Sequence, residues 1–211
     1  MVPHFFVMEP GPMPAMSKLE ACNEMLLAIG QAPVNTLEVP GIRDVSVAIA
    51  ILDNVSREVQ SGGHSFNSFV EELTPTVNGF LLVPSDVLHI DAADPTIAVI
   101  PVVDPADDIL KLFDQDKRTF VFGDKLEVEI TKLLAFEALP QHARRYILAM
   151  AKLRFQASVV GSNLLNSLIG QELDMAYAAF RRAELHMQDN NILYAGGTII
   201  SRNRHRLRRY S

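Results

Sequence analysis

The chain has 211 residues, of which 48% are apolar and 21% charged, and its formal net charge is −6. This balance excludes a chain that is disordered throughout, and the length allows one domain or one domain with an insertion. A single cysteine, Cys22, excludes an intrachain disulfide and fits assembly in a reducing cytoplasm.

The first residues do not have the pattern of a signal peptide. Residues 1–8 contain no Lys or Arg, and Pro10, Pro12 and Pro14 interrupt any apolar segment that follows. The longest apolar runs are far below the ~20 residues that span a bilayer. We interpret residues 1–16 as an irregular N-terminal arm, with a frayed terminus as the alternative, and expect a soluble chain with no membrane partner.

Two helices are predicted next. Ser17 and Glu20 have the spacing of a capping box, apolar residues follow at helical spacing, and Gly30 stands where a C-terminal glycine belongs. Cys22 lies on this apolar stripe, so we expect it to be a small core side chain. Asp44 is the expected N-cap of a second helix, which reaches residue 60 and ends at the glycine pair 62–63.

The segment from 65 to 135 changes to short β-rich runs. Turn pairs such as Asn78-Gly79 and Asp104-Pro105 separate them, and residues 126–130 alternate strictly between apolar and acidic side chains. We predict antiparallel strands in five runs: 66–70, 80–83, 97–100, 119–122 and 126–130.

Two more helices complete the pattern. Pro140 at N1 begins the third, with its core face at Tyr146, Met150, Leu153 and Ala157, beside Ile147 and Ala151. The fourth runs from about 163 to 189, and its length suits a helix that also serves an interface. Its expected core-facing residues are Leu165, Ile169, Leu173, Ala176, Phe180, Ala183 and Met187.

No motif for catalysis or metal binding stands out. No two histidines are three or four residues apart, and there is no CxxC or HExxH, so we predict no metal and no cofactor. Gly62-Gly63-His64-Ser65 lacks the setting of a nucleophile elbow and is interpreted as a helix stop. Paired carboxylates, Glu127 with Glu129 among them, are interpreted as an acidic surface. We therefore expect a protein that is not an enzyme.

The C-terminus is strongly basic, whereas the rest is acidic. Five arginines lie within residues 202–211, and the other 14 basic and 25 acidic side chains leave residues 1–201 at −11. An acidic body opposes DNA binding, so we favour an acidic protein surface as the target; DNA contact and a solvated tail are the alternatives. The candidate contact residues are Arg202, Arg204, Arg206, Arg208, Arg209 and Tyr210.

Four segments carry a family resemblance: 23–30, 33–38, 51–60 and 139–147, the last leading to Ala151 and Phe155-Gln156. Over roughly 17–190 the chain resembles the tail tubular protein A family, the portal-side tail adaptors of short-tailed bacteriophages. It departs at His64, where the family usually has a tryptophan. The resemblance implies an α+β fold, an antiparallel helical bundle (17–64 and 136–190) with an inserted antiparallel β domain (65–135) and an extended portal-docking tail (191–211).

The resemblance also implies a role. Such a protein forms a ring, typically of twelve copies, that joins the portal ring to the nozzle ring of the tail tubular protein B type. It is assembled in the host cytoplasm and resides in the neck of the virion tail, where double-stranded DNA passes through without specific binding. The basic tail then becomes the portal contact. Candidates for acidic residues that face the channel are Asp107, Asp108, Glu127 and Glu129.

Three other functions fit parts of the sequence. A head-to-tail connector of a longer-tailed phage shares the helical core, but it predicts a smaller β insertion. A tail-associated peptidoglycan hydrolase would use paired carboxylates across a cleft. A DNA-binding protein with a basic tail predicts affinity that falls steeply with salt.

Overall fold

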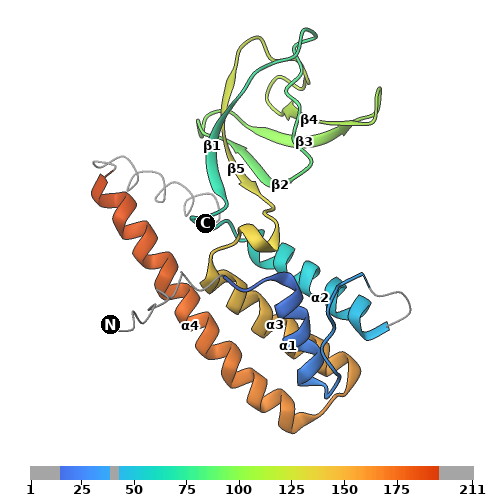
Figure 1. The fold of residues 1–211 in the computed structure, drawn as a ribbon. Coiled ribbons are helices and arrows are strands. Elements are labelled where there is room, and N and C mark those ends of the chain that lie inside the picture. Colours follow the sequence, from blue (N-terminus) through green and yellow to red (C-terminus); the bar gives the residue numbers. More distant parts are fainter. Residues whose placement is uncertain (1–14, 39–42, 195–211) are drawn as a thin grey trace, which may run out of the picture.

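The structure is a computed structural model that describes residues 15–38 and 43–194, with side chains through residue 187. It contains two units, each built around its own hydrophobic core (Figure 1). The helical unit consists of α1 (Lys18–Ala28), α2 (Arg43–Gln60), a short 3-10 turn η1 (Phe136–Ala138), α3 (Gln141–Val159) and α4 (Asn163–Tyr194). The β unit, between α2 and η1, consists of β1 (Ser68–Leu73), β2 (Val87–Ala92), β3 (Val99–Asp104), β4 (Ile109–Asp114) and β5 (Leu126–Lys132). The mixture of helices and antiparallel sheet is an α+β fold, as predicted.

The start of α1 follows from a local signal in the sequence. The Ser17 hydroxyl accepts a hydrogen bond from the Glu20 backbone amide at 3.2 Å, and the Glu20 carboxylate accepts one from the Ser17 amide at 2.7 Å. This is the predicted capping box, and it satisfies two backbone donors that the first helical turn leaves open. Gly30 follows the helix with φ +79°, a conformation that favours glycine.

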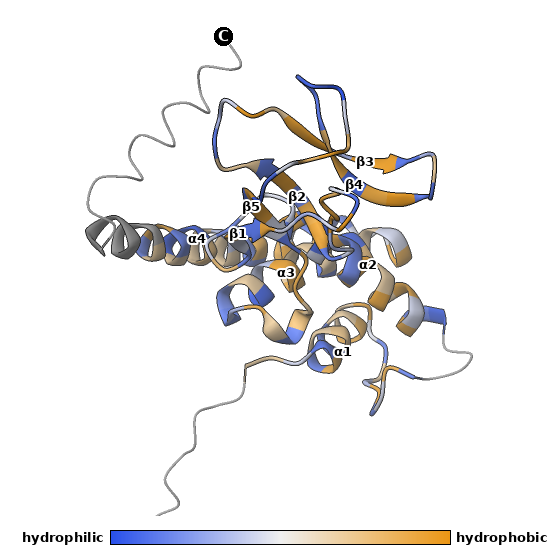
Figure 2. Ribbon diagram, turned by 90° about the horizontal axis from the view of Figure 1, so that it is seen from above, coloured by the Kyte–Doolittle hydropathy of each residue, from blue (hydrophilic) through white to orange (hydrophobic). Residues whose placement is uncertain are grey.

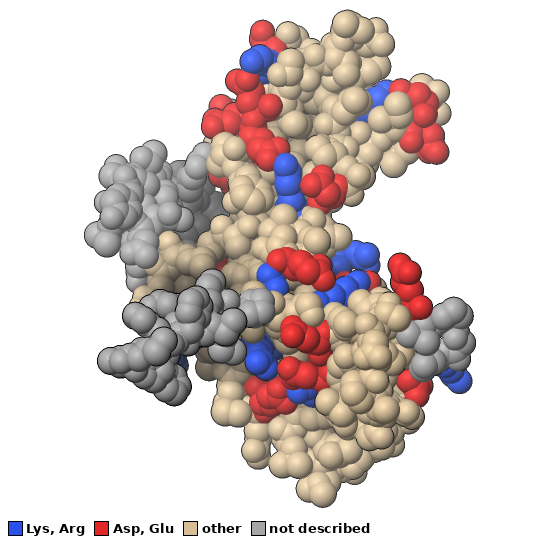
Figure 3. Space-filling view, viewed as in Figure 1, with Lys and Arg blue, Asp and Glu red and all other residues tan. Residues whose placement is uncertain are grey.

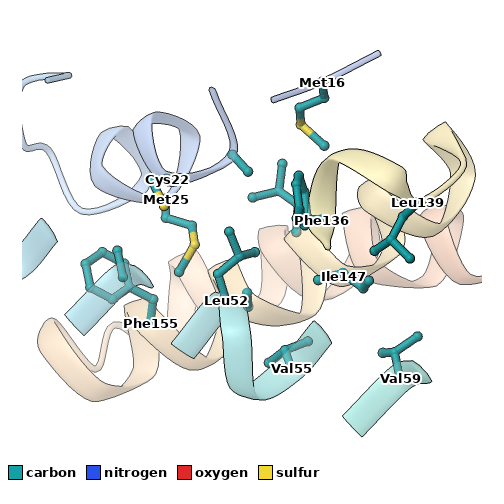
Figure 4. Close-up of a cluster of buried hydrophobic side chains, with 14 of the residues drawn as sticks. Met16, Cys22, Met25, Leu52, Val55, Val59, Phe136, Leu139, Ile147 and Phe155 are labelled. Atoms are coloured by element: carbon teal, nitrogen blue, oxygen red, sulfur yellow. The ribbon is translucent and has the colours of Figure 1, made fainter. Parts of the chain in front are cut away.

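The core of the helical unit forms around α3, which packs against each of the other three long helices. Leu52 of α2, Met25 of α1 and Ile147 and Phe155 of α3 meet there, all nearly inaccessible to solvent (Figure 4). Burying such side chains contributes roughly 1.5–3 kcal/mol each. Cys22 is part of this core, as expected.

The β unit contains two small antiparallel sheets, one with strand order β1-β5-β2 and one formed by β3 and β4. Their inner faces share a second core that includes Leu81, Leu112, Val128 and Ile130. The hydropathy view shows these apolar stretches along the strands (Figure 2). The alternation predicted for β5 is confirmed, because Leu126, Val128 and Ile130 are buried while Glu127 is exposed.

Two predicted strands are wrong, and two strands were missed. Residues 80–83 and 119–122 take part only in isolated bridges and form no ladder: Phe80 with Val121, Leu82 with Lys111 and Thr119 with Asp114. The missed strands are β2 and β4. Both contain charged residues. The partner of β2 is the distant β5, whereas β4 forms a hairpin with β3, which precedes it.

Several helix details also differ from the sequence predictions. Asp44 lies inside the first turn of α2 and is not its N-cap. Pro140 is the N-cap of α3 and not its N1 residue, so this helix begins one residue later than predicted. Ala157 is exposed, because the deepest side of α3 is instead the one that carries Phe155. Met16, assigned to the arm, is 6% exposed within the helical core.

The helix α4 extends to Tyr194, beyond the predicted end near 189. Ile169 and Phe180 are buried on its predicted inner face, and Met187 is exposed at the edge of that face. Within the described ranges, no helix combines the length and apolar character needed to cross a membrane.

Candidate functional site

The basic segment proposed to bind the portal, Arg202 to Tyr210, lies outside the described residues. The four acidic candidates are described, and they fall into two separate groups. Asp107 and Asp108 lie in the turn between β3 and β4, whereas Glu127 and Glu129 lie on β5 in the other sheet. The fold therefore does not gather all four at one place.

The charge of Asp107 is compensated within the β unit. Its carboxylate lies 2.5 Å from the ammonium of Lys111, a side chain that is only 1% exposed. Asp104 contacts the same ammonium at 2.7 Å, and the Phe80 ring lies 4.0 Å from it. Desolvation opposes the charge, but the bonds to Asp104 and Asp107 outweigh it and raise the pKa of the Lys111 ammonium. This buried cluster fixes the β3–β4 turn.

Glu127 and Glu129 belong to an acidic sheet face. In the register of the three-stranded sheet, Glu127 pairs with Glu72 of β1, and Glu129 pairs with Asp91 of β2. Lys125 forms an ion pair with Glu72 at 2.6 Å. Since successive residues of a strand point to opposite sides, these carboxylates lie opposite the buried core residues. Carboxylates gather along one side of the β unit (Figure 3).

The helix α4 carries a second apolar stripe, which we call the outer stripe: Leu164, Leu168, Met175 and Leu185. These side chains are 72%, 55%, 68% and 53% exposed. At about 100° per residue they lie within about 60° of Leu164 around the helix axis, on the side opposite Ile169 and Phe180. Gln171 and Arg182 lie on the same side, so the outer stripe is mainly and not wholly apolar. A helix with apolar side chains on both sides has the pattern of one packed between two partners. Among the described elements, only α3 packs extensively against α4.

Two chain segments connect the β unit to the helices, and buried amides join them into one stem. The side chain of Gln60 donates to the Leu134 carbonyl at 3.0 Å and accepts from the Leu134 amide at 2.7 Å. Asn67 donates to the carbonyls of Gln60 and Lys132, both at 2.9 Å. Gln60 and Asn67 are each 0% exposed, and we call residues 60–67 and 132–134 the stem.

A carboxylate of α4 holds the stem from outside. Glu184, only 5% exposed, accepts hydrogen bonds from the Ser65 backbone amide at 3.1 Å and from the Ser65 hydroxyl at 3.0 Å. His64 Nδ1 lies 3.5 Å and His142 Nε2 4.0 Å from the same carboxylate. Burial lowers the pKa of His142, against the opposing attraction of Glu184. The Phe180 ring lies beneath, 4.9 Å from the ring of His64.

The Ser65, His64 and Glu184 set does not have the geometry of a catalytic triad. The serine hydroxyl donates its hydrogen bond directly to the carboxylate, and His64 Nε2 contacts the Val59 carbonyl at 2.8 Å. Among the described residues, no hydrogen bond joins either ring nitrogen of His64 to the Ser65 hydroxyl, so no imidazole serves the serine as a base. A cavity of about 350 Å³ adjoins the set, and Glu58 and Tyr177 help to line it. The described residues contain no group of three or more ligand side chains arranged for a metal ion.

Sequence reasoning missed Gln60, Asn67 and Glu184. Gln60 and Glu184 lie within helical runs of ordinary polar composition, and their partners are 74 and 119 residues away. No local pattern marks such contacts. The weak signal available was His64-Ser65 after a glycine pair, which the sequence analysis assigned to a helix stop.

Comparison with known proteins gives these features a family. Residues 19–190 match the family described as Tail tubular protein. The chain is also 29% identical over 132 residues to the Tail tubular protein A of Klebsiella phage KP34, a match that spans 63% of this chain and 67% of that protein. The resemblance inferred from the sequence is therefore confirmed. The chain belongs to the tail tubular protein family and is a structural component of the phage virion tail.

Proposed function

We propose that this tail protein is the adaptor that forms a ring between the portal and the nozzle. The observation that carries the proposal is the outer stripe of α4, which is mainly apolar, exposed and opposite a stripe that is already buried. In a ring, one face of each subunit meets a different face of the next. We assign the outer stripe to that contact, with a second copy of the chain as its partner.

The acidic sheet face supports a channel that does not hold DNA. Fixed negative charge on a wall repels phosphates, so a duplex slides past without being bound. Among the four sequence candidates, Glu127 fits this role better than Asp107, because Glu127 is exposed on the sheet face whereas Lys111 compensates the charge of Asp107. Asp108 lies exposed in the same turn and is the weaker candidate by position.

The basic segment is assigned to the portal. Arginine forms bidentate bonds with carboxylates and is common at protein interfaces, so Arg202–Arg209 fit an acidic surface on the portal ring. Tyr210 adds an aromatic side chain with a polar end.

Mixing the purified protein with its cognate portal ring tests the proposal. Light-scattering mass and negative-stain images are recorded for the full chain, for a chain lacking 202–211, and for a chain in which the five arginines are lysines. We expect a ring-on-ring particle for the full chain, none for the truncated chain, and weaker binding for the lysine variant. A full chain that stays separate from the portal at low and moderate salt would refute the adaptor role.

Two observations weigh against the other functions. The β unit contains five strands, whereas a longer-tailed connector predicts a small insertion or none. For a hydrolase, the carboxylates that line the cavity accept hydrogen bonds from neighbouring groups, which is the opposite of what a general acid needs. Hydrogen bonds from Arg154, at 2.6 and 2.8 Å, lower the pKa of Glu58, and Glu184 accepts two bonds from Ser65. A general acid needs a carboxyl that remains protonated.

A further inference from the structure

The two units share little surface. Strands pack chiefly against strands and helices against helices, and the two hydrophobic cores do not merge. Figure 1 shows the β unit standing on the end of the helical unit, joined to it by two adjacent chain segments. The orientation of the β unit is therefore determined mainly by the stem and by whatever holds the stem.

The stem itself is rigid. Gln60 and Asn67 bridge its two segments with buried hydrogen bonds of 2.7–3.0 Å, and the Lys132 amide adds a bond to the Asn67 carbonyl at 2.9 Å. With both segments joined in this way, the stem moves as one body together with β1 and β5. A contact at Ser65 thus acts on the whole β unit.

The contact at Ser65 comes from the long helix. Glu184 binds both the amide and the hydroxyl of Ser65, and the ring of His64 lies between this carboxylate and Phe180 of the same helix. Charged acceptors form the stronger class of hydrogen bond, and this one is almost fully removed from water. A second carboxylate of α4, Glu172, pairs with Lys152 of α3.

We propose that Glu184 and Ser65 form a clasp that sets the orientation of the β unit relative to α4. A displacement of α4 then turns the β unit, because the stem follows the carboxylate. The clasp links the helix that carries the outer stripe to the sheets of the β unit. This inference concerns the isolated chain and stands independently of the portal and nozzle contacts.

Distances between spin labels test the clasp directly. Labels are placed at Asp124→Cys, at the end of β5 remote from the stem, and at Ser167→Cys on α4; both positions are exposed. Cys22 is 0% exposed, so it stays unlabelled in the folded chain. Labelled protein is diluted with unlabelled protein, so that only distances within one chain are measured. The wild-type clasp is expected to give one narrow distance distribution.

The variants separate the clasp from general effects on the helix. Glu184→Ala removes both bonds and is expected to at least double the width of the distribution. Ser65→Ala removes only the hydroxyl bond and is expected to widen it by a smaller amount, still beyond the control, while helix content by circular dichroism stays unchanged in both. Glu172→Ala removes a carboxylate contact of the same helix and is the matched control, expected to leave the width unchanged. If Glu184→Ala does not fold, the test is whether the distance distribution of Ser65→Ala is wider than that of Glu172→Ala. Wild-type widths in the folded clasp variants, or equal broadening in Glu172→Ala, would overturn the proposal.

Discussion

Replacing Gln60 by methionine should lower the free energy of unfolding, because it removes two buried hydrogen bonds to the backbone of Leu134. Methionine has a similar shape and fills the site, but it bonds to neither backbone group of Leu134. The amide and carbonyl of Leu134 belong to the backbone and remain in the variant, and each lowers the free energy of unfolding by about 1–3 kcal/mol when it is buried without a hydrogen bond. Additional apolar burial returns about 1 kcal/mol. With both groups unpaired and this return subtracted, we expect a net loss of about 1–5 kcal/mol in the free energy of unfolding, centred near about 3 kcal/mol.

Urea unfolding followed by circular dichroism measures this loss, and a parallel thermal scan should show a midpoint about 6–12 °C lower. Ser56→Ala is the matched control, because it removes only the third bond of the Gln60 amide, which is 3.0 Å long. The control should cost about 1 kcal/mol or less. If Gln60→Met unfolds within 0.5 kcal/mol of the wild type, the buried amide does not hold the stem in the way argued above.

Three further predictions concern other parts of the molecule. Burial raises the pKa of the Cys22 thiol to about 11, so a thiol reagent at pH 8 should react only as the chain unfolds. Burial lowers the pKa of His142 below its usual 6.5, so the unfolded chain binds a proton there at a higher pH than the folded chain does. The free energy of unfolding should therefore fall as the pH drops through about 6.5 and become constant below the folded pKa, and His142→Gln should flatten this dependence. Met175→Asp should change the unfolding free energy by no more than about 0.5 kcal/mol, since the side chain is 68% exposed, yet abolish ring assembly on the portal.

A specific outcome would contradict each of these three predictions. Cys22 labelled within minutes in the native chain would place the thiol at the surface. A His142→Gln variant with the same pH profile as the wild type would exclude this imidazole as the source. For the outer stripe, Val77→Asp is the control, since that side chain is fully exposed on a turn of the β unit; normal ring assembly by Met175→Asp would remove the outer stripe from the interface.

Elements with local signals could be predicted from the sequence. The capping box of α1, the strict alternation of β5 and the inner stripe of α4 each depend on residues a few positions apart, and each lies where expected. The strands β2 and β4 lack such a signal. Lys111 at the centre of β4 is characteristic of an exposed position, and it becomes buried only because Asp104 and Asp107 meet it across the turn.

The candidate site was less accessible to such reasoning. Glu184 lies on the inner side of α4, four residues after Phe180, but a carboxylate is usually solvated, and its burial depends on Ser65, 119 residues earlier. Gln60 and Asn67 are polar residues that fill the centre of the stem, which no periodicity indicates. The β unit is inserted between α2 and η1, so the chain leaves and re-enters the helical unit at adjacent points. Gln60 and Asn67 join the two segments at these points.

That insertion has a consequence for how the chain folds. The helical core needs α1 and α2 to meet α3 after an interval that separates Gln60 from Leu134 by 74 residues, and closing a flexible loop of that length costs about 4 kcal/mol. Because β1 pairs with β5, a β unit that forms early already brings its two ends together. We expect the β unit to be the folding nucleus of this chain. Substitutions at Val128 should then slow refolding, whereas substitutions at Phe155 should mainly speed unfolding.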